Sequence, residues 1–202
     1  MTFRSPIRPQ GTIVAATAIP WLLLAGCHGP DLATVPTQPT VIQREAAGWT
    51  RVVQPGWFSA LMPHAPEHGE LKTTAPQGGV LVMKQVSTTS NGTMLAIAYA
   101  QLEGFDDHDA MLAEVRKTWQ EGGAVPIQNV DIVVGGRDGV EGWLDIPPGT
   151  KLNPSTSHMS ARVRVLLDQS RAYLLIGIEP SNTQASILPR FFDSFEFAPV
   201  AR

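Results

Sequence analysis

The run TMLAIAYAQL at residues 93–102 decides the kind of fold, because it is apolar almost throughout. Both sets of alternate positions are apolar, which predicts a β-strand that is covered on both faces, or one that meets small packing partners on one of them. Residues 80–87, which begin with four apolar residues, predict a second strand. Asn91-Gly92 lies between the two segments and is the strongest short signal for a hairpin turn. The sequence therefore predicts an antiparallel hairpin with a deeply buried second strand.

Further strands are expected on both sides of this hairpin. Short apolar or alternating segments bounded by turn residues predict strands at 49–53, 57–62, 130–134, 140–146, 161–168, 171–179 and 195–197. Residues 63–69 and 147–160 are expected to form loops. Arg162 and Arg164 alternate with valines, so both arginines are expected on one face of the sheet or at its rim.

Two helices are expected as well. Aspartates within residues 106–109 can cap the first helix and match its dipole, and Gly122-Gly123 can end it. The apolar face of this helix consists of Met111, Leu112, Val115 and Trp119. Residues 181–192 predict a shorter helix, weakened by Pro189. Hairpin-linked strands pair antiparallel and helices must cover a sheet face, so the predicted fold class is α+β, a mainly antiparallel sheet with helices packed on it.

The N-terminal residues 1–26 have the three parts of an export signal. Arg4 and Arg8 come first, a short apolar run follows, and small residues precede Cys27. Leu24-Ala25-Gly26-Cys27 resembles a bacterial lipobox, which implies removal of the signal and lipid attachment to Cys27, the only cysteine of the chain. A transmembrane helix is a poorer interpretation, because the run is shorter than the roughly 20 residues required and contains Pro20. A plain secretory signal with a chance cysteine is the other alternative.

The resemblance implies a protein exported and anchored to a bacterial cell membrane through lipid. Residues 27–47 are rich in proline and threonine and predict an extended, solvated tether. The alternative for this segment is a first strand packed on the domain. Residues 48–202 are then expected to form a single domain, long enough to bury a core without disulfides or metals.

The charge of the chain excludes some partners. The formal net charge is −3, and without Arg4 and Arg8 the predicted mature part has 13 basic and 18 acidic residues, a charge of −5. A mildly acidic protein without basic clusters is a poor candidate for binding nucleic acid or anionic lipid headgroups. The expected partners are therefore the membrane, through the lipid on Cys27, and an unknown protein or small molecule, with no nucleic acid.

Four segments resemble motifs of one group of exported bacterial domains. Residues 57–63 are similar to the opening motif of the group, residues 190–197 to its closing motif, and residues 162–164 and 171–175 to its late hairpin. These domains share the fold of PsbP, the extrinsic subunit of photosystem II, and of a nuclear Ran-binding protein of the Mog type. The resemblance covers most of residues 49–198 and implies a PsbP-like fold. Members of this fold are mostly binding or assembly factors, the bacterial lipoproteins among them are largely without assigned activity, and the motifs carry no catalytic group.

The candidates for chemistry are weak. His64 and His68 have Pro66 between them and a glutamate in the wrong place for a zinc-hydrolase helix. The aspartates of residues 106–109 are explained by helix capping, and the glycines of residues 135–139 by a hairpin turn. The serines around His158 lack the strained elbow of a serine hydrolase. No catalytic residue, metal site or cofactor is therefore expected.

The tryptophans offer a different type of site. Core packing is the ordinary role of Trp49, Trp57, Trp119 and Trp143, but tryptophan is also enriched in binding hot spots. We expect a candidate binding surface around the 147–160 loop, formed by Trp49, Trp57, Trp143 and His158. The leading functional hypothesis is a lipid-anchored, non-catalytic binding or accessory module at the bacterial cell envelope. The alternatives are a carrier of a small apolar ligand and an envelope hydrolase with an unrecognised site.

Overall fold

The computed structural model describes residues 40–45, 48–74, 80–102, 107–168 and 171–198. The predicted signal, the lipidation residue Cys27 and the first part of the predicted tether lie outside these residues. None of the helices in the described part is long and apolar enough to span a membrane. The architecture below is that of the folded domain alone.

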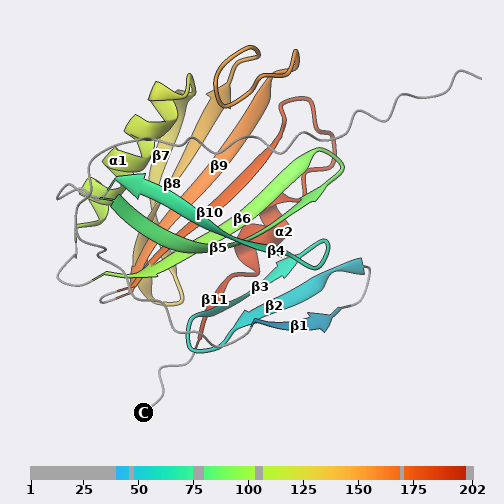
Figure 1. The fold of residues 1–202 in the computed structure, drawn as a ribbon, viewed down its shortest axis with the longest axis vertical. Coiled ribbons are helices and arrows are strands. Elements are labelled where there is room, and N and C mark those ends of the chain that lie inside the picture. Colours follow the sequence, from blue (N-terminus) through green and yellow to red (C-terminus); the bar gives the residue numbers. More distant parts are fainter. Residues whose placement is uncertain (1–39, 46–47, 75–79, 103–106, 169–170, 199–202) are drawn as a thin grey trace, which may run out of the picture.

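The described residues form two antiparallel sheets and two helices (Figure 1). The larger, seven-stranded sheet has the order β4-β5-β6-β10-β9-β8-β7. Its strands are β4 (Glu67–Thr74), β5 (Val80–Ser90), β6 (Thr93–Gln101), β7 (Val125–Val134), β8 (Arg137–Ile146), β9 (Met159–Asp168) and β10 (Arg171–Pro180). The smaller sheet has the order β1-β2-β3-β11, with β1 (Val41–Arg44), β2 (Thr50–Gln54), β3 (Phe58–Met62) and β11 (Glu196–Phe197). The helices are α1 (His108–Glu121) and α2 (Leu188–Asp193).

The β5–β6 hairpin is confirmed, and its second strand is covered on both faces. Asn91 and Gly92 have φ values of 50° and 79°, the left-handed backbone that a tight hairpin turn of this kind requires. The alanines of β6 point toward α1, and Leu95, Ile97 and Tyr99 point toward the smaller sheet and α2. The alternation therefore separates two cores, one on each face of the large sheet.

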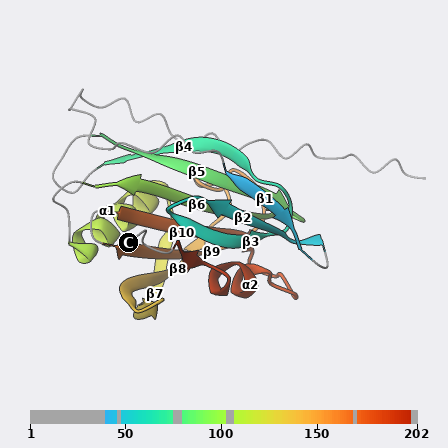
Figure 2. The ribbon, with the colours of Figure 1, turned by 90° about the horizontal axis from the view of Figure 1, so that it is seen from below.

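Helix α1 lies within the concave side of the large sheet. Asp107 accepts a hydrogen bond from the backbone N–H of Ala110 at 2.9 Å, as expected of an N-cap. Met111, Val115 and Trp119 are buried against the sheet. Because α1 contacts both β4 and β7, which are the two edge strands, the sheet curls around the helix, as Figure 2 shows from a second side.

Helix α2 and the smaller sheet cover the opposite face. The predicted helix over 181–192 is wrong in its first half: turns and bends precede α2, which starts at Leu188 with Pro189 in its first turn. Proline fits there because the N–H groups of the first turn have no intrahelical acceptor, so no hydrogen bond is lost when one of them is missing. Gly177 of β10 allows close approach, since a Cβ there would lie 2.6 Å from a methyl carbon of Leu188 and 3.0 Å from the ring of Phe192.

Two further boundaries differ from the predictions. Residues 41–44, at the end of the predicted tether, form β1 and pair with β2, so the sheet starts before Gly48. All four side chains are exposed, so the strand lacks the alternation that would have revealed it. Residues 67–69, predicted as loop, begin β4, which is held mainly by backbone pairing with β5. The fold is dominated by antiparallel sheet, with 13% helix, instead of a balanced α+β mixture.

Candidate functional site

The four residues of the predicted binding surface do not lie together. Trp57 is 1% exposed and packs in the core, with its ring centroid 5.0 Å from that of Tyr99 and 6.1 Å from that of Tyr173. Its carbonyl oxygen also accepts a hydrogen bond from the Tyr173 hydroxyl at 3.3 Å. Trp57 is thus a structural residue, and its inclusion in a surface is wrong.

Trp49 is half-buried and lies where the smaller sheet meets α2. The Arg190 guanidinium carbon lies 4.3 Å from the centroid of the Trp49 ring, a cation–π contact. Arg190 is on the exposed side of α2, while Phe191 and Phe192 of the same helix are buried. Trp49 therefore contacts the outer side of α2 and is separate from the 147–160 loop.

Trp143 and His158, in contrast, are brought to the same part of the domain. Trp143 is half-buried on β8, opposite Arg162 of β9. Asp145 lies two residues further along β8 and therefore projects from the same face. The Nδ1 atom of the exposed His158 ring is 3.4 Å from Oδ1 of Asp145. We call these four residues, Trp143, Asp145, His158 and Arg162, the Trp143 face.

A buried charge network lies beside the Trp143 face. Glu141 is 2% exposed, and each of its carboxylate oxygens is bound by a guanidinium group. Oε1 lies 2.8 Å from Nη2 of Arg162, and Oε2 lies 2.8 Å from both Nε and Nη2 of Arg164. Arg164 also donates from Nη1 to the carbonyl oxygen of Phe192 at 2.7 Å. The network thus fastens α2 to β8 and β9.

The arginines of this network also contact aromatic rings. The guanidinium carbon of Arg162 is 4.6 Å from the centroid of Phe192 and 5.6 Å from that of Trp143, so it lies near both rings. The network contains two guanidinium groups and one carboxylate, so its net charge is positive. The Nε atom of Arg162 is buried and has no hydrogen-bond partner. The network was not predicted: the shared face of Arg162 and Arg164 was expected, but Glu141 was not recognised as their partner, although it precedes Trp143 by two residues on the same strand.

This arrangement is suited to recognition. Both oxygens of the Glu141 carboxylate are engaged by guanidinium groups, so this side chain acts as the structural partner of the two arginines. The Trp143 face presents an aromatic ring and a guanidinium group, two side-chain types that are enriched in binding hot spots, together with the His158–Asp145 pair. Arg162 retains 19% exposure of its side chain, so part of it remains accessible to a partner.

Tyr99 and Tyr173 have raised pKa values for a structural reason. Burial raises the pKa of Tyr173 and of Tyr99 above the ordinary value of a phenol, because the ionised form is poorly solvated in the core. Both rings pack against Trp57 and Phe58. The phenols therefore remain neutral and act as packing groups.

The remaining sequence candidates have structural explanations. No group of three or more histidine, cysteine, aspartate or glutamate side chains within the described ranges is placed to hold a metal ion. Gly135 and Gly136 have φ values of 56° and 76° in the β7–β8 turn. Ser155 donates from its hydroxyl to Oδ1 of Asn153 at 2.6 Å, and the Asn153 amide donates to the carbonyl oxygens of Ile146 and Ser157. This serine thus supports the 147–160 loop.

Two hollows differ in size and lining. The interior cavity between α1 and the large sheet, bordered by Met83, Met111 and Val115, has a volume of about 10 Å³, room for at most one water molecule. The other hollow is open and has a volume of about 740 Å³. It lies between the start of α1 and the β7–β8 hairpin and is lined by Asp107, Asp109, Asp131, Ile132, Val133, Asp138, Gly139 and Val140.

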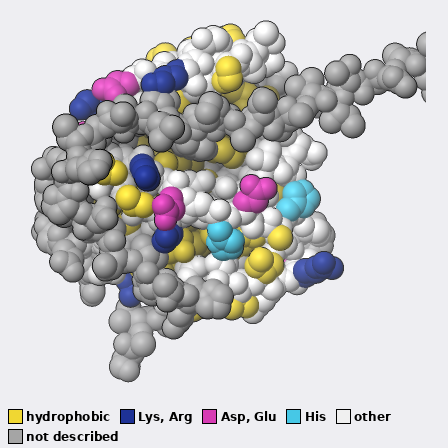
Figure 3. All heavy atoms as spheres, viewed as in Figure 1, with side chains coloured by type: hydrophobic (Ala, Val, Ile, Leu, Met, Phe, Trp, Pro, Cys, Tyr) yellow, Lys and Arg dark blue, Asp and Glu magenta, His cyan; other side chains and the backbone are white. Residues whose placement is uncertain are grey.

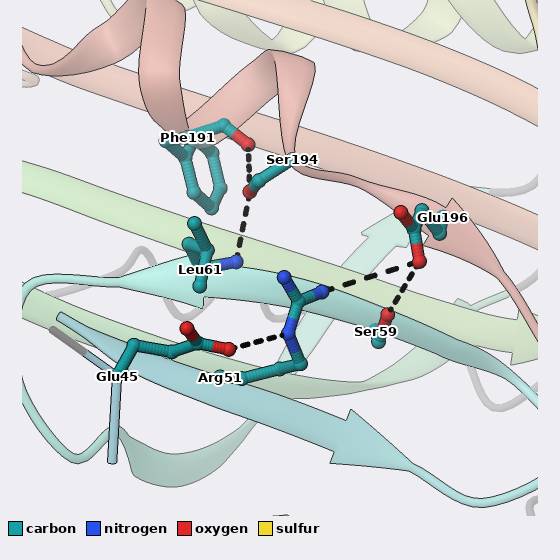
Figure 4. A network of polar contacts seen from close by, with 7 residues as sticks. All are labelled: Glu45, Arg51, Ser59, Leu61, Phe191, Ser194 and Glu196. Carbon is teal, nitrogen blue, oxygen red and sulfur yellow. Dashed lines mark hydrogen bonds and ion pairs between the residues drawn. The ribbon is translucent and has the colours of Figure 1, made fainter. Parts of the chain in front are cut away.

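A second polar network connects β11 and the end of α2 to the other strands of the smaller sheet (Figure 4). Arg51 donates from Nε to Oε1 of Glu45 at 2.9 Å, and its Nη1 lies 4.0 Å from Oε2 of Glu196. Ser194 accepts from the backbone N–H of Leu61 at 2.8 Å and donates to the carbonyl oxygen of Phe191 at 2.7 Å. These contacts join β2, β3 and β11 to the end of α2.

Comparison with known proteins gives distant similarities only. No protein-family model and no curated protein matches the sequence. The solution structure of cyanobacterial PsbP (CyanoP) from Synechocystis is 13% identical, with 86% of this chain and 98% of that chain covered and a TM-score of 0.43. A Pseudomonas aeruginosa protein of unknown function is 10% identical, with 70% and 83% covered and a TM-score of 0.37. Similarity this distant assigns no function to the chain.

Proposed function

We propose that this protein is a lipid-anchored, non-catalytic binding or accessory module of the bacterial cell envelope, with a PsbP-like domain as its folded part. The observation that carries the proposal is Leu24-Ala25-Gly26-Cys27, which follows a basic start and a short apolar run and contains the only cysteine. Two or three acyl chains on Cys27 would hold the protein at the membrane, since each buried methylene contributes about 0.8 kcal/mol.

The Trp143 face is the surface proposed to bind the partner. It combines a half-buried tryptophan with an accessible arginine and an exposed histidine, and the Glu141 network beside it holds Arg162 in place. The surface is therefore preorganised before a partner binds, which reduces the entropy cost of binding.

Replacing Cys27 by serine tests the anchor. The full chain, produced in a bacterium fed with a tagged fatty acid, is expected to be labelled and to sediment with membranes. Cys27→Ser should lose the label and either leave the membrane fraction or remain as an uncleaved precursor, while the control Thr34→Ser should behave as wild type. An unlabelled wild-type protein, or unchanged fractionation of Cys27→Ser, would contradict lipid anchoring.

Replacing Trp143 by alanine tests the binding surface. Crosslinking in intact cells, followed by purification of the full chain from solubilised membranes, should capture a partner with the wild type and with Trp49→Ala. Trp143→Ala should lose it, because the ring is removed and the support of Arg162 is weakened. The same partner captured equally by Trp143→Ala, in a variant that remains folded by circular dichroism, would move the binding site elsewhere.

A further inference from the structure

The edge strand β7 carries an unusual share of the exposed apolar side chains. Within the described part of the chain, Val125, Ile127 and Val133 are 52%, 66% and 69% exposed. Among the strands that the structure describes, β7 is the last of the large sheet and pairs only with β8, so one side of its backbone has no partner among them. Exposed apolar edges are the usual templates for pairing with an added strand.

The other edge of the same sheet is different. β4 has exposed side chains at Glu67, His68, Glu70 and Lys72, and Figure 3 shows charged and histidine side chains scattered over the face that carries β4. Charged residues on an edge strand discourage pairing with other chains. β4 is thus protected by charged side chains along its length, whereas Asp131 is the only charged residue of β7, and Pro126 and the register shift affect only its first part.

The open acidic hollow lies directly beside β7. Val133 of β7 pairs with Asp138 of β8, and Asp131 pairs with Val140, so all four project toward the side of α1. Together with Asp107 and Asp109, the hollow of about 740 Å³ contains four carboxylates and no basic residue among its lining side chains. The opposite side of β7 is apolar, since Ile132 and Val134 pack against the core next to the smaller sheet.

These features favour one kind of occupant. A second copy of the chain, paired through β7, would place two of these acidic hollows side by side, so that like charges repel. An extended segment of a partner protein with basic side chains on one face fits the acidic side of β7, which also carries the exposed Val133. Apolar side chains on its other face would lie next to the half-buried Ile132 and Val134. The register shift between Pro126 and Gln128 restricts regular pairing to residues 128–134.

We propose that β7 binds an extended basic segment of a partner protein as an added strand, with its basic side chains over the hollow at Asp131 and Asp138. The added strand supplies backbone hydrogen bonds, and the alternation of its side chains supplies specificity. The acidic side of this surface faces α1 and not the Trp143 face, although Gln128 at one end of the segment pairs with Trp143. The proposal does not depend on the lipid on Cys27.

The probe is a capped peptide of about eight residues that alternates lysine and valine, added to the full chain in detergent. Hydrogen–deuterium exchange should show slower exchange at residues 128–134 when the peptide binds, because their free amides become paired. A matched glutamate–valine peptide should give no protection. The double variant Asp131→Asn with Asp138→Asn should bind the lysine peptide about 2- to 30-fold more weakly, as expected for the loss of two exposed ion pairs.

The double variant Glu67→Gln with Asp193→Asn removes the same charge at exposed positions outside β7 and the hollow and should bind as wild type. If this control variant bound the lysine peptide as weakly as the aspartate variant does, the effect would come from net charge alone, and the proposal would be overturned. Equal protection by both peptides, or binding without protection of β7, would overturn it as well. Protection of β7 that rises with protein concentration in the absence of peptide would show that the occupant is a second copy.

Discussion

Two arginine–glutamate networks in this domain use the same chemistry in opposite surroundings. In the first, Glu141 is held between Arg162 and Arg164 and is almost wholly buried. In the second, Arg51 bridges Glu45 and Glu196, whose side chains are 39% and 71% exposed (Figure 4). The distances of the shorter ion pairs are alike, at 2.8 Å and 2.9 Å. Contact distance alone therefore does not tell which network matters for stability.

The difference lies in what happens when one partner is lost. Water replaces a missing partner in the exposed network, so the remaining charge is solvated at little cost. Around Glu141, water cannot replace a lost partner in this way, because Phe192 and the adjacent strands exclude solvent from the guanidinium of Arg164. The buried network is thus expected to be required for the fold of α2 on the sheet, while the exposed one is expected to be dispensable.

Replacing Glu141 by alanine should have the largest effect. It leaves two guanidinium groups without their shared carboxylate, one of them with only 8% of its side chain exposed, and breaking a buried pair in this way costs about 3–5 kcal/mol. Urea denaturation of the full chain, followed by tryptophan fluorescence, measures the loss. A change below 1 kcal/mol would show that water reaches the arginines and that the two networks are equivalent.

Phe195→Ala should be nearly as destabilising, although Phe195 lies between two residues of the exposed network. Its ring is 4% exposed and stacks on Phe58 with centroids 5.7 Å apart, so its removal leaves a cavity. A loss of about 3 kcal/mol is expected, at the lower end of the range for phenylalanine, because β11 is short and lies at the rim of the sheet, where it can partly collapse.

The control for this variant is Glu196→Gln, the next residue, which should leave stability unchanged within about 0.5 kcal/mol. Denaturant midpoints of both variants give the comparison directly. If Phe195→Ala kept the wild-type midpoint but lost binding of a captured partner, the closing segment would be a recognition surface, and its role in the core would be wrong.

Arg51→Ala should have the smallest effect. Both of its ion pairs are exposed, so a loss of about 1 kcal/mol or less is expected, and it should shrink further as salt is added. Denaturation at low and high ionic strength measures it, with Arg51→Lys as the variant that keeps the charge. A loss as large as that of Glu141→Ala, independent of salt, would remove the distinction between the networks.

Local patterns were enough to predict much of the fold. Asn91-Gly92 predicted a hairpin because few residues tolerate the left-handed backbone of such a turn, and the alternation in 93–102 predicted two covered faces. Asp107 predicted the start of α1 because capping involves only neighbouring residues. Strands with weak side-chain signals were harder to predict, because backbone pairing with a neighbour holds them. β1 corresponds only to the alternative interpretation of the tether, and the start of β4 was expected to be a loop.

The sequence by itself determined the features that depend on neighbours along the chain: the hairpin turns, the apolar faces, the helix cap and the expectation of a lipid anchor at Cys27. Only the tertiary structure decided which residues from distant segments meet. It buried Trp57, brought His158 to Asp145 beside Trp143, and enclosed Glu141 between two arginines. The physical reason is that burial and charge pairing depend on strand order and register, which arise from the packing of the whole domain and which no local pattern records.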